Sequence, residues 1–499
     1  MDEEISSDSE TLIKTGIAGL DDVLAGGFTP NRIYLIQGNP GSGKTTLGLQ
    51  YLLEGVKNGE SVLYVTLSET KVELESVARS HGWSIEAIVI CELAASEESL
   101  KHDAQLAMFH SSEVELSETT DRILAEAERT KPRRVVFDSL SEMRLLAQNP
   151  LRYRRQILAL KQFFAGRECT VLLLDDQTSD AGDLQLQSIA NGVISMTQLV
   201  PEYGAERRRL RVVKMRGMHC RGGYHDFVIQ RGGLKVFPRL VAAEHHQPFA
   251  AEELKSGVAE LDQLLGGGLD RGTSTLLMGP AGCGKTSIAV QYAVTAARLG
   301  ERTALFMFDE NPRTLLTRAA KLGMGLENDI KAGRITIQQI DPAELSPGEF
   351  AHSIRNAVEN NGARIVVIDS LNGYLNAMPE ERFLSIQLHE LLSYLAQVGV
   401  STFIILAQHG LVGGTLEVPV DISYLSDTVI LVRYFEARGQ LRRAISVVKK
   451  RSGTHEDFIR EMRLGADGIR ISERLDEFQG ILAGVPSFLG PLAKHDQGK

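Results

Sequence analysis

The sequence is poor in cysteine and in long apolar runs. Its 499 residues include four cysteines, and no two of them form a C-x-x-C pair, which argues against a disulfide framework and against a zinc site. No run of about eighteen apolar residues occurs, so no membrane-spanning helix is expected. The first residues, MDEEISSDSE, are acidic and lack the basic and apolar segments of a signal peptide. We therefore expect a cytoplasmic protein.

An excess of basic residues is also absent. The formal net charge is -10, whereas a protein that wraps nucleic acid normally has a net basic domain. The basic run RRRLRVVKMR, which starts at Arg207, has no interleaved aromatic residues and is only a weak indication of a nucleic-acid interface. The composition therefore disfavours both nucleic acid and membrane as partners.

The dominant feature is an internal repeat. The segment TGIAGLDDVLAGGFTPNRIYLIQGNPGSGKTTLGLQYL, from Thr15, returns as SGVAELDQLLGGGLDRGTSTLLMGPAGCGKTSIAVQYA, from Ser256. Later, RRVVFDSL corresponds to ARIVVIDSL, and RVVKMRG corresponds to SVVKKRSG. The chain is too long for one ordinary core, so the repeat predicts two domains. We place them at residues 1–245 and 246–486, divided within the polar segment VAAEHHQPFAA, with a short tail at 487–499.

Short β-branched runs alternate with helical patterns in each half. RIYLIQ, SVLYVTL, RRVVFD and CTVLLLD are almost continuously apolar, which predicts parallel strands covered by helices on both faces. After Val193 the runs VISMTQLV, RRLRVVKM and HDFVIQ follow one another closely and predict an antiparallel extension of the sheet. The expected fold class is α/β, with two tandem domains that each contain a mostly parallel sheet.

Two glycine-rich loops predict nucleotide binding. GNPGSGKT and GPAGCGKT both satisfy G-x-x-x-x-G-K-[ST], follow an apolar strand and precede a helical pattern. In such a loop backbone amides surround the phosphates of ATP, the lysine neutralises their charge, and the hydroxyl binds Mg²⁺. The predicted nucleotide-binding residues are Gly38, Asn39, Pro40, Gly41, Ser42, Gly43, Lys44, Thr45, Thr46, Gly279, Pro280, Ala281, Gly282, Cys283, Gly284, Lys285, Thr286 and Ser287.

Each half also contains an aspartate at the end of a later strand. A phosphate loop needs a carboxylate on a neighbouring strand, because that carboxylate and the loop hydroxyl together hold Mg²⁺. Asp138 in RRVVFDS and Asp369 in RIVVIDS end such strands. The predicted Mg²⁺ sites are therefore Thr45 with Asp138 and Thr286 with Asp369.

Further acids follow the strand after each phosphate-loop helix. Hydrolysis of a phosphoanhydride requires a carboxylate that orients or deprotonates the attacking water. Glu69 is the candidate in the first half, and Asp309 and Glu310 are the candidates in the second. A solvated acid at the end of a strand is the competing interpretation for each.

Two segments, VVKMRG and VVKKRS, place a lysine and an arginine on one strand face, because alternate strand residues point the same way. Lys214 with Arg216, and Lys449 with Arg451, are candidates to reach the γ-phosphate bound by a neighbouring subunit, as a trans arginine finger does. Such a head-to-tail contact would close into a ring. The alternative is a basic strand face exposed to solvent.

These motifs together resemble the KaiC family of tandem RecA-like ATPases, from about Thr11 to Pro486. The resemblance implies a double-ring homohexamer that binds ATP between subunits, with an ATPase in the first ring and an autokinase and autophosphatase in the second. In that family the second half phosphorylates adjacent Ser and Thr residues. The matching stretch, DISYLSDTVILV, has Ser423 at the serine position and Tyr424 where threonine is expected.

The chain departs from the family at several points. The family commonly has two glutamates at each acid cluster, whereas this chain has Ser68 before Glu69 and Asp309 before Glu310. In clock-type members a longer tail than PSFLGPLAKHDQGK binds KaiA, so the resemblance disfavours a KaiA-like partner and leaves a KaiB-like partner open.

Three functions compete at this point. The first is a KaiC-like ATPase and serine autokinase that regulates timing, stress or signalling. The second is a RecA- or RadA-like DNA-dependent ATPase, and the third is a nucleotide-gated scaffold without kinase activity. The duplicated ATPase domain, the absence of an added DNA-binding module and the negative charge favour the first.

Overall fold

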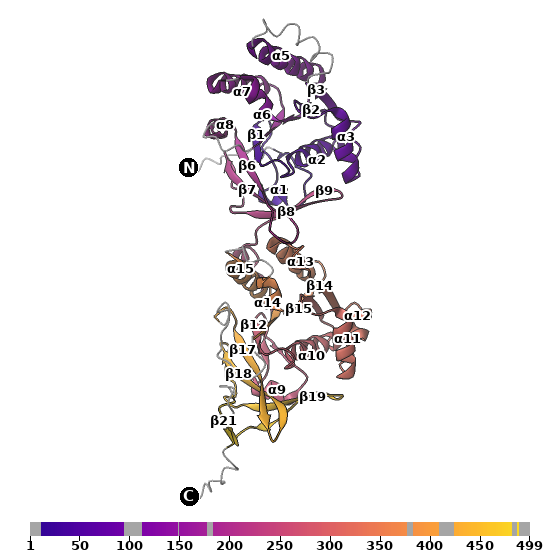
Figure 1. Cartoon of the computed structure of the whole chain (residues 1–499), viewed down its shortest axis with the longest axis vertical. Coiled ribbons are helices and arrows are strands. Elements are labelled where there is room, and N and C mark those ends of the chain that lie inside the picture. The colour runs from indigo at the N-terminus through magenta and orange to yellow at the C-terminus, as the bar shows by residue number, and fades with distance from the viewer. Residues whose placement is uncertain are drawn as a thin grey trace, which may run out of the picture. The chain divides into compact units, whose positions relative to one another are not determined.

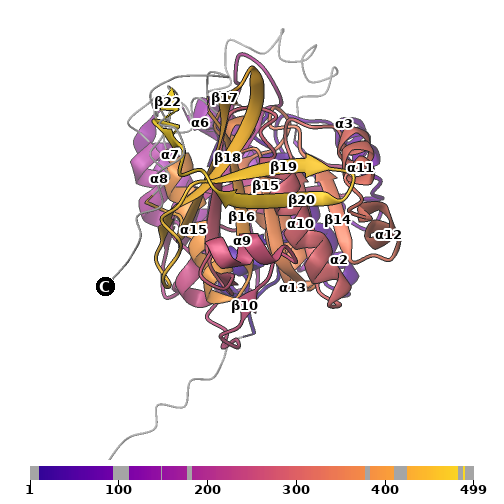
Figure 2. The same ribbon diagram turned by 90° about the horizontal axis from the view of Figure 1, so that it is seen from below.

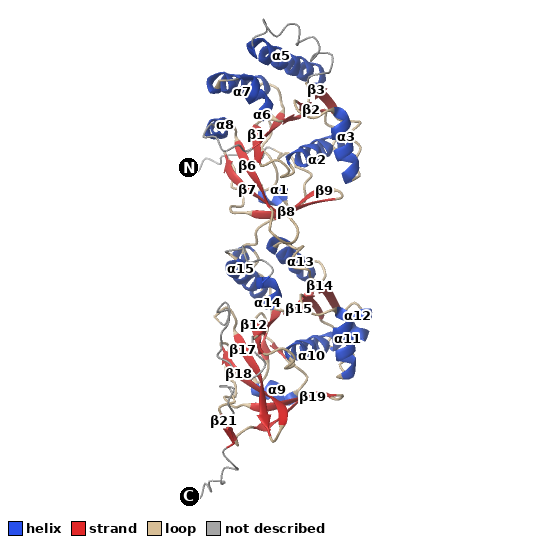
Figure 3. Cartoon of the chain, viewed as in Figure 1, coloured by secondary structure: helices blue, strands red, loops and turns tan. Residues whose placement is uncertain are grey.

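The computed structural model of the chain describes residues 11–93, 112–147, 149–176, 183–376, 383–408, 424–481 and 487–488, and every statement below concerns these residues. The chain divides into two units, Met1–Arg239 and Leu240–Lys499. Figure 1 labels their helices and strands, and Figure 3 shows strands in red with helices in blue on both sides of them in each unit. The domain limits 1–245, 246–486 and 487–499 remain predictions.

The elements of the first unit alternate as the apolar runs predict. They are α1 (Leu20–Val23), β1 (Ile33–Gly38), α2 (Lys44–Lys57), β2 (Val62–Thr66), α3 (Lys71–His81), β3 (Val89–Glu92), α5 (Ser112–Thr130), β4 (Arg134–Asp138), α6 (Leu140–Ala147), α7 (Pro150–Ala165), β5 (Thr170–Asp176), α8 (Asp183–Ile189), β6 (Gly192–Leu199), β7 (Arg207–Met215), β8 (His225–Gln230) and β9 (Gly233–Phe237).

These strands form one sheet in the order β3-β2-β4-β5-β1-β6-β7-β8-β9. The pairs from β3 to β6 are parallel, and the pairs from β6 to β9 are antiparallel. Strands β1, β2 and β4 are buried along their whole length, because helices cover both faces. The predicted α/β fold with its antiparallel extension is therefore confirmed.

The second unit repeats this order. Its elements are η1 (Ala242–Glu244), β10 (Glu253–Leu254), α9 (Ala259–Leu264), β11 (Leu269–Asp270), β12 (Ser274–Gly279), α10 (Lys285–Arg298), β13 (Arg302–Met307), α11 (Pro312–Lys321), α12 (Leu326–Lys331), β14 (Ile335–Gln339), α13 (Pro347–Glu359), β15 (Ala363–Asp369), α14 (Leu371–Asn376), α15 (Leu384–Gln397), β16 (Ser401–Ala407), β17 (Thr428–Ala437), β18 (Gln440–Lys450), β19 (Arg460–Gly465), β20 (Gly468–Arg474), β21 (Phe478–Gln479) and β22 (Ser487–Phe488).

The second large sheet has the order β14-β13-β15-β16-β12-β17-β18-β19-β20, which matches the first strand for strand. Figure 2 shows its last two strands, β19 and β20, side by side in yellow, where they pair antiparallel. Helices α9 to α12 pack on one face of this sheet and helices α13 to α15 on the other. No helix of the described residues is long and apolar enough to span a membrane.

In both sheets the parallel strands end on one edge, where ligands of open α/β sheets bind. Strand β1 leads into the loop before α2, and strand β4 ends at Asp138 on the same edge. The residues after β2 reach that edge as well. The topology therefore brings the phosphate loop, the strand-end aspartate and the acid cluster of each half together.

Candidate nucleotide sites

The first phosphate loop connects β1 to α2. Gly38 must be glycine, because a Cβ there would lie 2.6 Å from the backbone oxygen of Met196. Gly43 takes a left-handed φ of 95° at the helix N-cap, a conformation that favours glycine. The Lys44 ammonium lies over the loop and donates to the carbonyls of Gly38 at 2.9 Å and Asn39 at 3.0 Å. Because the first backbone N–H groups of a helix have no partner within the helix, those at the start of α2 can bind an anion.

The second phosphate loop has the same geometry. A Cβ at Gly279 would lie 2.0 Å from the backbone oxygen of Val432, and Gly284 has a φ of 109° at the N-cap of α10. The Lys285 ammonium donates to the carbonyls of Gly279 at 2.8 Å and Pro280 at 2.7 Å. Cys283 is buried inside this loop, and burial raises the pKa of its thiol, so it is an inert packing group.

In each unit the hydroxyl and the carboxylate of the predicted Mg²⁺ site are hydrogen-bonded to each other. Thr45 Oγ1 donates to Asp138 Oδ2 at 2.7 Å, and Thr286 Oγ1 donates to Asp369 Oδ2 at 2.6 Å. Burial raises the pKa of Asp138, and it raises the pKa of Asp369 to about 6. A divalent cation would offset this burial cost, because it favours the charged carboxylate. Hydroxyl and carboxylate oxygens are also the donors that Mg²⁺ prefers, so the residues fit the ion.

Glu69 lies beside the metal pair of the first unit. The Thr66 hydroxyl donates to the Glu69 carbonyl at 2.6 Å and accepts from its amide at 3.0 Å, which fixes the turn after β2. The next residue, Thr70, caps α3 by accepting from the Glu73 amide. Burial, and then the neighbouring Asp138 carboxylate, raise the pKa of Glu69 to about 7. Its Oε2 atom is buried without a hydrogen-bond partner among the described residues.

The corresponding acids of the second unit, Asp309 and Glu310, both have side-chain partners. Glu310 forms a two-pronged ion pair with Arg318 of α11, in which Nη1 and Nη2 each lie 2.8 Å from a carboxylate oxygen. Asp309 accepts a hydrogen bond from the hydroxyl of Ser370. In the first unit Val77 stands at the position of Arg318, and Ser68 at that of Asp309. The two acid clusters therefore differ in their partners although their backbones repeat.

The structure adds two residues that the motifs did not identify. The Tyr64 hydroxyl donates to Asp138 Oδ2 at 2.5 Å, and Asp176 at the end of β5 forms a 2.8 Å ion pair with the Lys44 ammonium. Strand register places Leu305 opposite Val367 where Tyr64 lies opposite Val136 in the first sheet. Both contacts therefore belong to the first unit. The doubled aspartate that ends CTVLLLDD is the sequence signal that could have indicated one of them.

The Lys-x-Arg pairs lie on β7 and at the end of β18. Lys214 donates to the carbonyls of Gln187 at 2.6 Å and Ala190 at 2.8 Å, next to the end of α8. In the second unit, Lys449 donates to the Ser426 carbonyl at 2.7 Å. The matching arginines make similar contacts: Arg216 to the carbonyl of Ser188 at 3.1 Å and Arg451 to that of Tyr424 at 2.7 Å. Each pair thus holds the turn before β6 or β17. The candidate phosphoacceptor Ser423 lies outside the described residues.

A duplicated, mostly parallel sheet with a phosphate loop after its central strand and a Thr-Asp pair beside it defines a tandem P-loop nucleotide-binding protein. The family model for the KaiC ATPase matches this chain twice, over residues 13–241 and 254–476. The chain therefore belongs to the KaiC family of ATPases, and this membership implies that it binds ATP.

Curated relatives agree with this assignment. The circadian clock oscillator protein KaiC of Parathermosynechococcus lividus is 26% identical over 492 residues, which cover 97% of this chain and 89% of the relative. The circadian clock protein KaiC3 of Synechocystis sp. is 26% identical over 480 residues, which cover 95% of this chain and 94% of the relative. The similarity thus spans both repeats.

Proposed function

We propose that this chain is a KaiC-like ring ATPase whose first unit hydrolyses ATP with Glu69 as the general base. The main support for this role is the position of Glu69. Its carboxyl group lies near the Thr45-Asp138 pair and has a pKa of about 7. A general base is most effective when its pKa lies near the operating pH. The Oε2 atom of Glu69, which is buried without a hydrogen-bond partner in the part of the chain that the structure describes, would accept the proton of the attacking water.

The other residues of the first unit have supporting roles in this proposal. The loop amides would cradle the triphosphate, and Lys44 would leave Asp176 for a phosphate oxygen. Thr45 and Asp138 would hold Mg²⁺, which when bound offsets negative charge on the phosphates. Tyr64 would keep the Asp138 carboxylate in place through its hydrogen bond.

Substitution of Glu69 by glutamine tests this role. Glu69→Gln should lower phosphate release from the first unit by about a hundredfold or more, since positioned bases contribute on that scale. Nucleotide binding should persist. The matched control is Glu75→Gln, which changes an exposed acid on α3. Release within about threefold of the wild type would contradict the role of Glu69.

Loss of folding can be separated from loss of catalysis in this variant. The pKa of Glu69 in the folded chain lies above the ordinary glutamate value, so Glu69 favours the folded state least when it is charged, above about pH 7. Glu69→Gln should therefore be at least as stable as the wild type at about pH 8. Thermal melting checks this expectation.

We also propose that the chain assembles into a homohexameric double ring in which Lys214 with Arg216, and Lys449 with Arg451, reach the nucleotide of a neighbouring copy. Lys214, Arg216 and Lys449 donate to backbone carbonyls, and Arg451 also pairs with the Asp427 carboxylate at 3.4 Å. A phosphate is a stronger partner for a cation than a neutral carbonyl. Light scattering with and without ATP tests the assembly.

Mixing two inactive variants tests the trans contact. Arg216→Ala should reduce hydrolysis by about a thousandfold while binding persists. When it is mixed with Glu69→Gln chains, some interfaces receive an intact Glu69 and an intact Arg216. Activity should then return to a measurable fraction of the wild type. If the mixed rings are as inactive as each variant alone, the contact between subunits is contradicted.

A serine autokinase in the second unit is the remaining part of the proposal. Its support is the likeness of DISYLSDTVILV to the family's phosphorylated stretch, which places Ser423 at the acceptor position. Incubation with γ-labelled ATP should label the wild type and not Ser423→Ala. Equal labelling of the two, or no labelling of either, would exclude this acceptor and leave an ATPase or a nucleotide-gated scaffold.

The regulatory role in timing, stress or signalling rests on the names of the relatives, which are clock proteins. A KaiB-like protein is the partner class we propose to test by co-sedimentation, and a KaiA-like partner is not proposed. Hydrolysis that single-stranded DNA stimulates, with binding that falls steeply as salt rises, would favour a DNA-dependent ATPase instead.

A further inference from the structure

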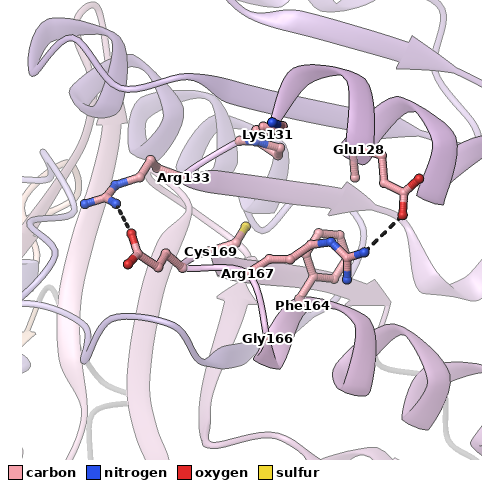
Figure 4. Close-up of a pocket in the computed structure, with 10 residues that line it drawn as sticks. Glu128, Lys131, Arg133, Phe164, Gly166, Arg167 and Cys169 are labelled. Atoms are coloured by element: carbon pink, nitrogen blue, oxygen red, sulfur yellow. Dashed lines mark hydrogen bonds and ion pairs between the residues drawn. The ribbon is translucent and has the colours of Figure 1, made fainter.

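A pocket of about 580 Å³ lies in the first unit at the end of the sheet opposite to the phosphate loop. The C-terminal ends of α5 and α7 and the turns that lead from them into β4 and β5 enclose it (Figure 4). Ala127, Phe164 and Cys169 form its apolar part, and Lys131, Arg133 and Arg167 supply positive charge. It takes no part in the nucleotide chemistry described above.

In the second unit the corresponding groove, between the ends of α13 and α15, is filled by the chain itself. Leu240 and Ala242 are buried in one cluster with side chains of α15. The Ala242 amide donates to Glu390 at 3.2 Å, and the ring of His245 packs edge-on against Tyr394 at 5.0 Å. The segment that links the two repeats therefore forms part of the second core.

The linking segment continues along the same groove. The amide of Gln247 donates to the carbonyl of Gln397 at 3.2 Å, where α15 ends. The ring of Phe249 then covers Gly399, so closely that a Cβ on this glycine would lie 2.5 Å from the ring. The segment from Leu240 to Phe249 thus lies along the base of the second sheet.

The repeat relates these contacts to the open pocket of the first unit. Counted from Asp138 and Asp369, Glu128 corresponds to Glu359, which lies 3.9 Å from His245. Counted from Asp176 and Ala407, which pair with the two loop glycines, Gly166 corresponds to Gln397 and Glu168 to Gly399. The pocket in Figure 4 is therefore the counterpart of the groove that the linking segment fills.

We propose that residues 1–10 of this chain occupy this pocket, as the linking segment occupies its counterpart. The bridge between Ile13 and Phe28 corresponds to the pairing of Leu254 with Leu269, so residues 1–10 precede the first sheet as the linking segment precedes the second. The carbonyl of Lys14 accepts a hydrogen bond from Arg134 at 2.8 Å, next to the rim residue Arg133. The chain is thus held at the start of β4, at the end of the sheet where the pocket lies.

The charges of residues 1–10 and of the pocket rim are complementary. MDEEISSDSE has five acids and one β-branched apolar residue, Ile5, whereas the rim carries Lys131, Arg133 and Arg167. Arg133 pairs with Glu168 at 2.6 Å and Arg167 with Glu128 at 3.0 Å, but these pairs are exposed. Exposed pairs contribute little, so acids of residues 1–10 can replace them at small cost.

Ile5→Asp in the full chain tests the proposal, because it removes the apolar anchor and adds a charge. Amide hydrogen exchange at residues 163–169 should become several times faster than in the wild type. The control Ser7→Asp adds the same charge beside the anchor and should leave exchange unchanged. Equal exchange in all three chains would overturn the proposal.

A labelled peptide of residues 1–10 provides a second readout. It should bind the Ile5→Asp chain saturably, with a Kd below about 0.1 mM, one tenth of the effective concentration of about 1 mM of a short tethered segment. The wild-type chain should bind it at least about tenfold more weakly, because its own segment already fills the pocket. Adding Arg167→Glu should abolish binding, whereas Arg79→Glu on α3 should not. Equal binding to both chains, or no effect of Arg167→Glu, would contradict the assignment.

Discussion

The two nucleotide sites share one backbone and differ in the partners of their charged groups. In the first site Lys44 is paired with Asp176, Asp138 accepts from Tyr64, and one Glu69 oxygen has no partner within the residues that the structure describes. In the second site Lys285 contacts only neutral groups among the interactions described above, and Arg318 holds Glu310.

We infer from this contrast that the two repeats have different activities on one fold. Phosphate binding depends on loop geometry, which both repeats preserve. Hydrolysis depends on an available, weakly acidic carboxylate, and Glu69 has a raised pKa of about 7, whereas Arg318 holds Glu310 in an ion pair. We therefore expect the first site to be the faster ATPase and the second to retain bound ATP longer.

The largest expected effect comes from removing a loop lysine. Lys44→Ala should abolish nucleotide binding in the first unit and, with it, ring assembly, because ATP is proposed to lie between subunits. Lys285→Ala should spare assembly and remove any phosphorylation. Light scattering with ATP measures assembly. A Lys44→Ala chain that still forms hexamers would contradict the role of ATP at the subunit interface.

The pH dependence of the two sites should also differ. As a base, Glu69 acts in its charged form, so kcat/KM of the first site should rise as pH increases through about 7 and then level off. From about pH 6 to about pH 8 the rise should be about tenfold. Hydrolysis by the Lys285→Ala chain isolates this site. A flat profile would exclude Glu69 as the titrating base.

Substitution of the residue that pairs with the loop lysine should change the affinity of that site for ATP. Asp176→Ala releases Lys44 from a partly buried ion pair worth about 1 kcal/mol, so ATP should bind the first site about fivefold more tightly. The reciprocal variant, Ala407→Asp, should weaken binding at the second site. Calorimetry measures both, and a change of the same sign in the two variants would contradict the role of this pair.

The smallest expected effect concerns Arg318. Arg318→Val restores the residue of the first unit and frees the Glu310 carboxylate, so hydrolysis by the second site should rise about threefold. The gain should disappear in the Arg318→Val, Glu310→Gln double variant. An unchanged rate in the single variant would mean that the ion pair does not limit this site.

Sequence patterns predicted the fold and the residues that lie within one contiguous motif. The loops, the strand-end aspartates and the antiparallel extension each follow from local spacing, and the structure brings Thr45 to Asp138 as that spacing requires. Tyr64 and Asp176 were missed because their roles depend on which strands are neighbours and in what register. The Glu310-Arg318 pair was missed because it depends on the phase of α11 relative to the preceding turn.

Each chain is expected to bind two ATP·Mg²⁺. Titration calorimetry measures this number directly and should find two sites in the wild type, one in the chain with a single loop lysine removed, and none when Lys44 and Lys285 are both replaced by alanine. Binding that is absent from the wild type, or undiminished in the double variant, would contradict it.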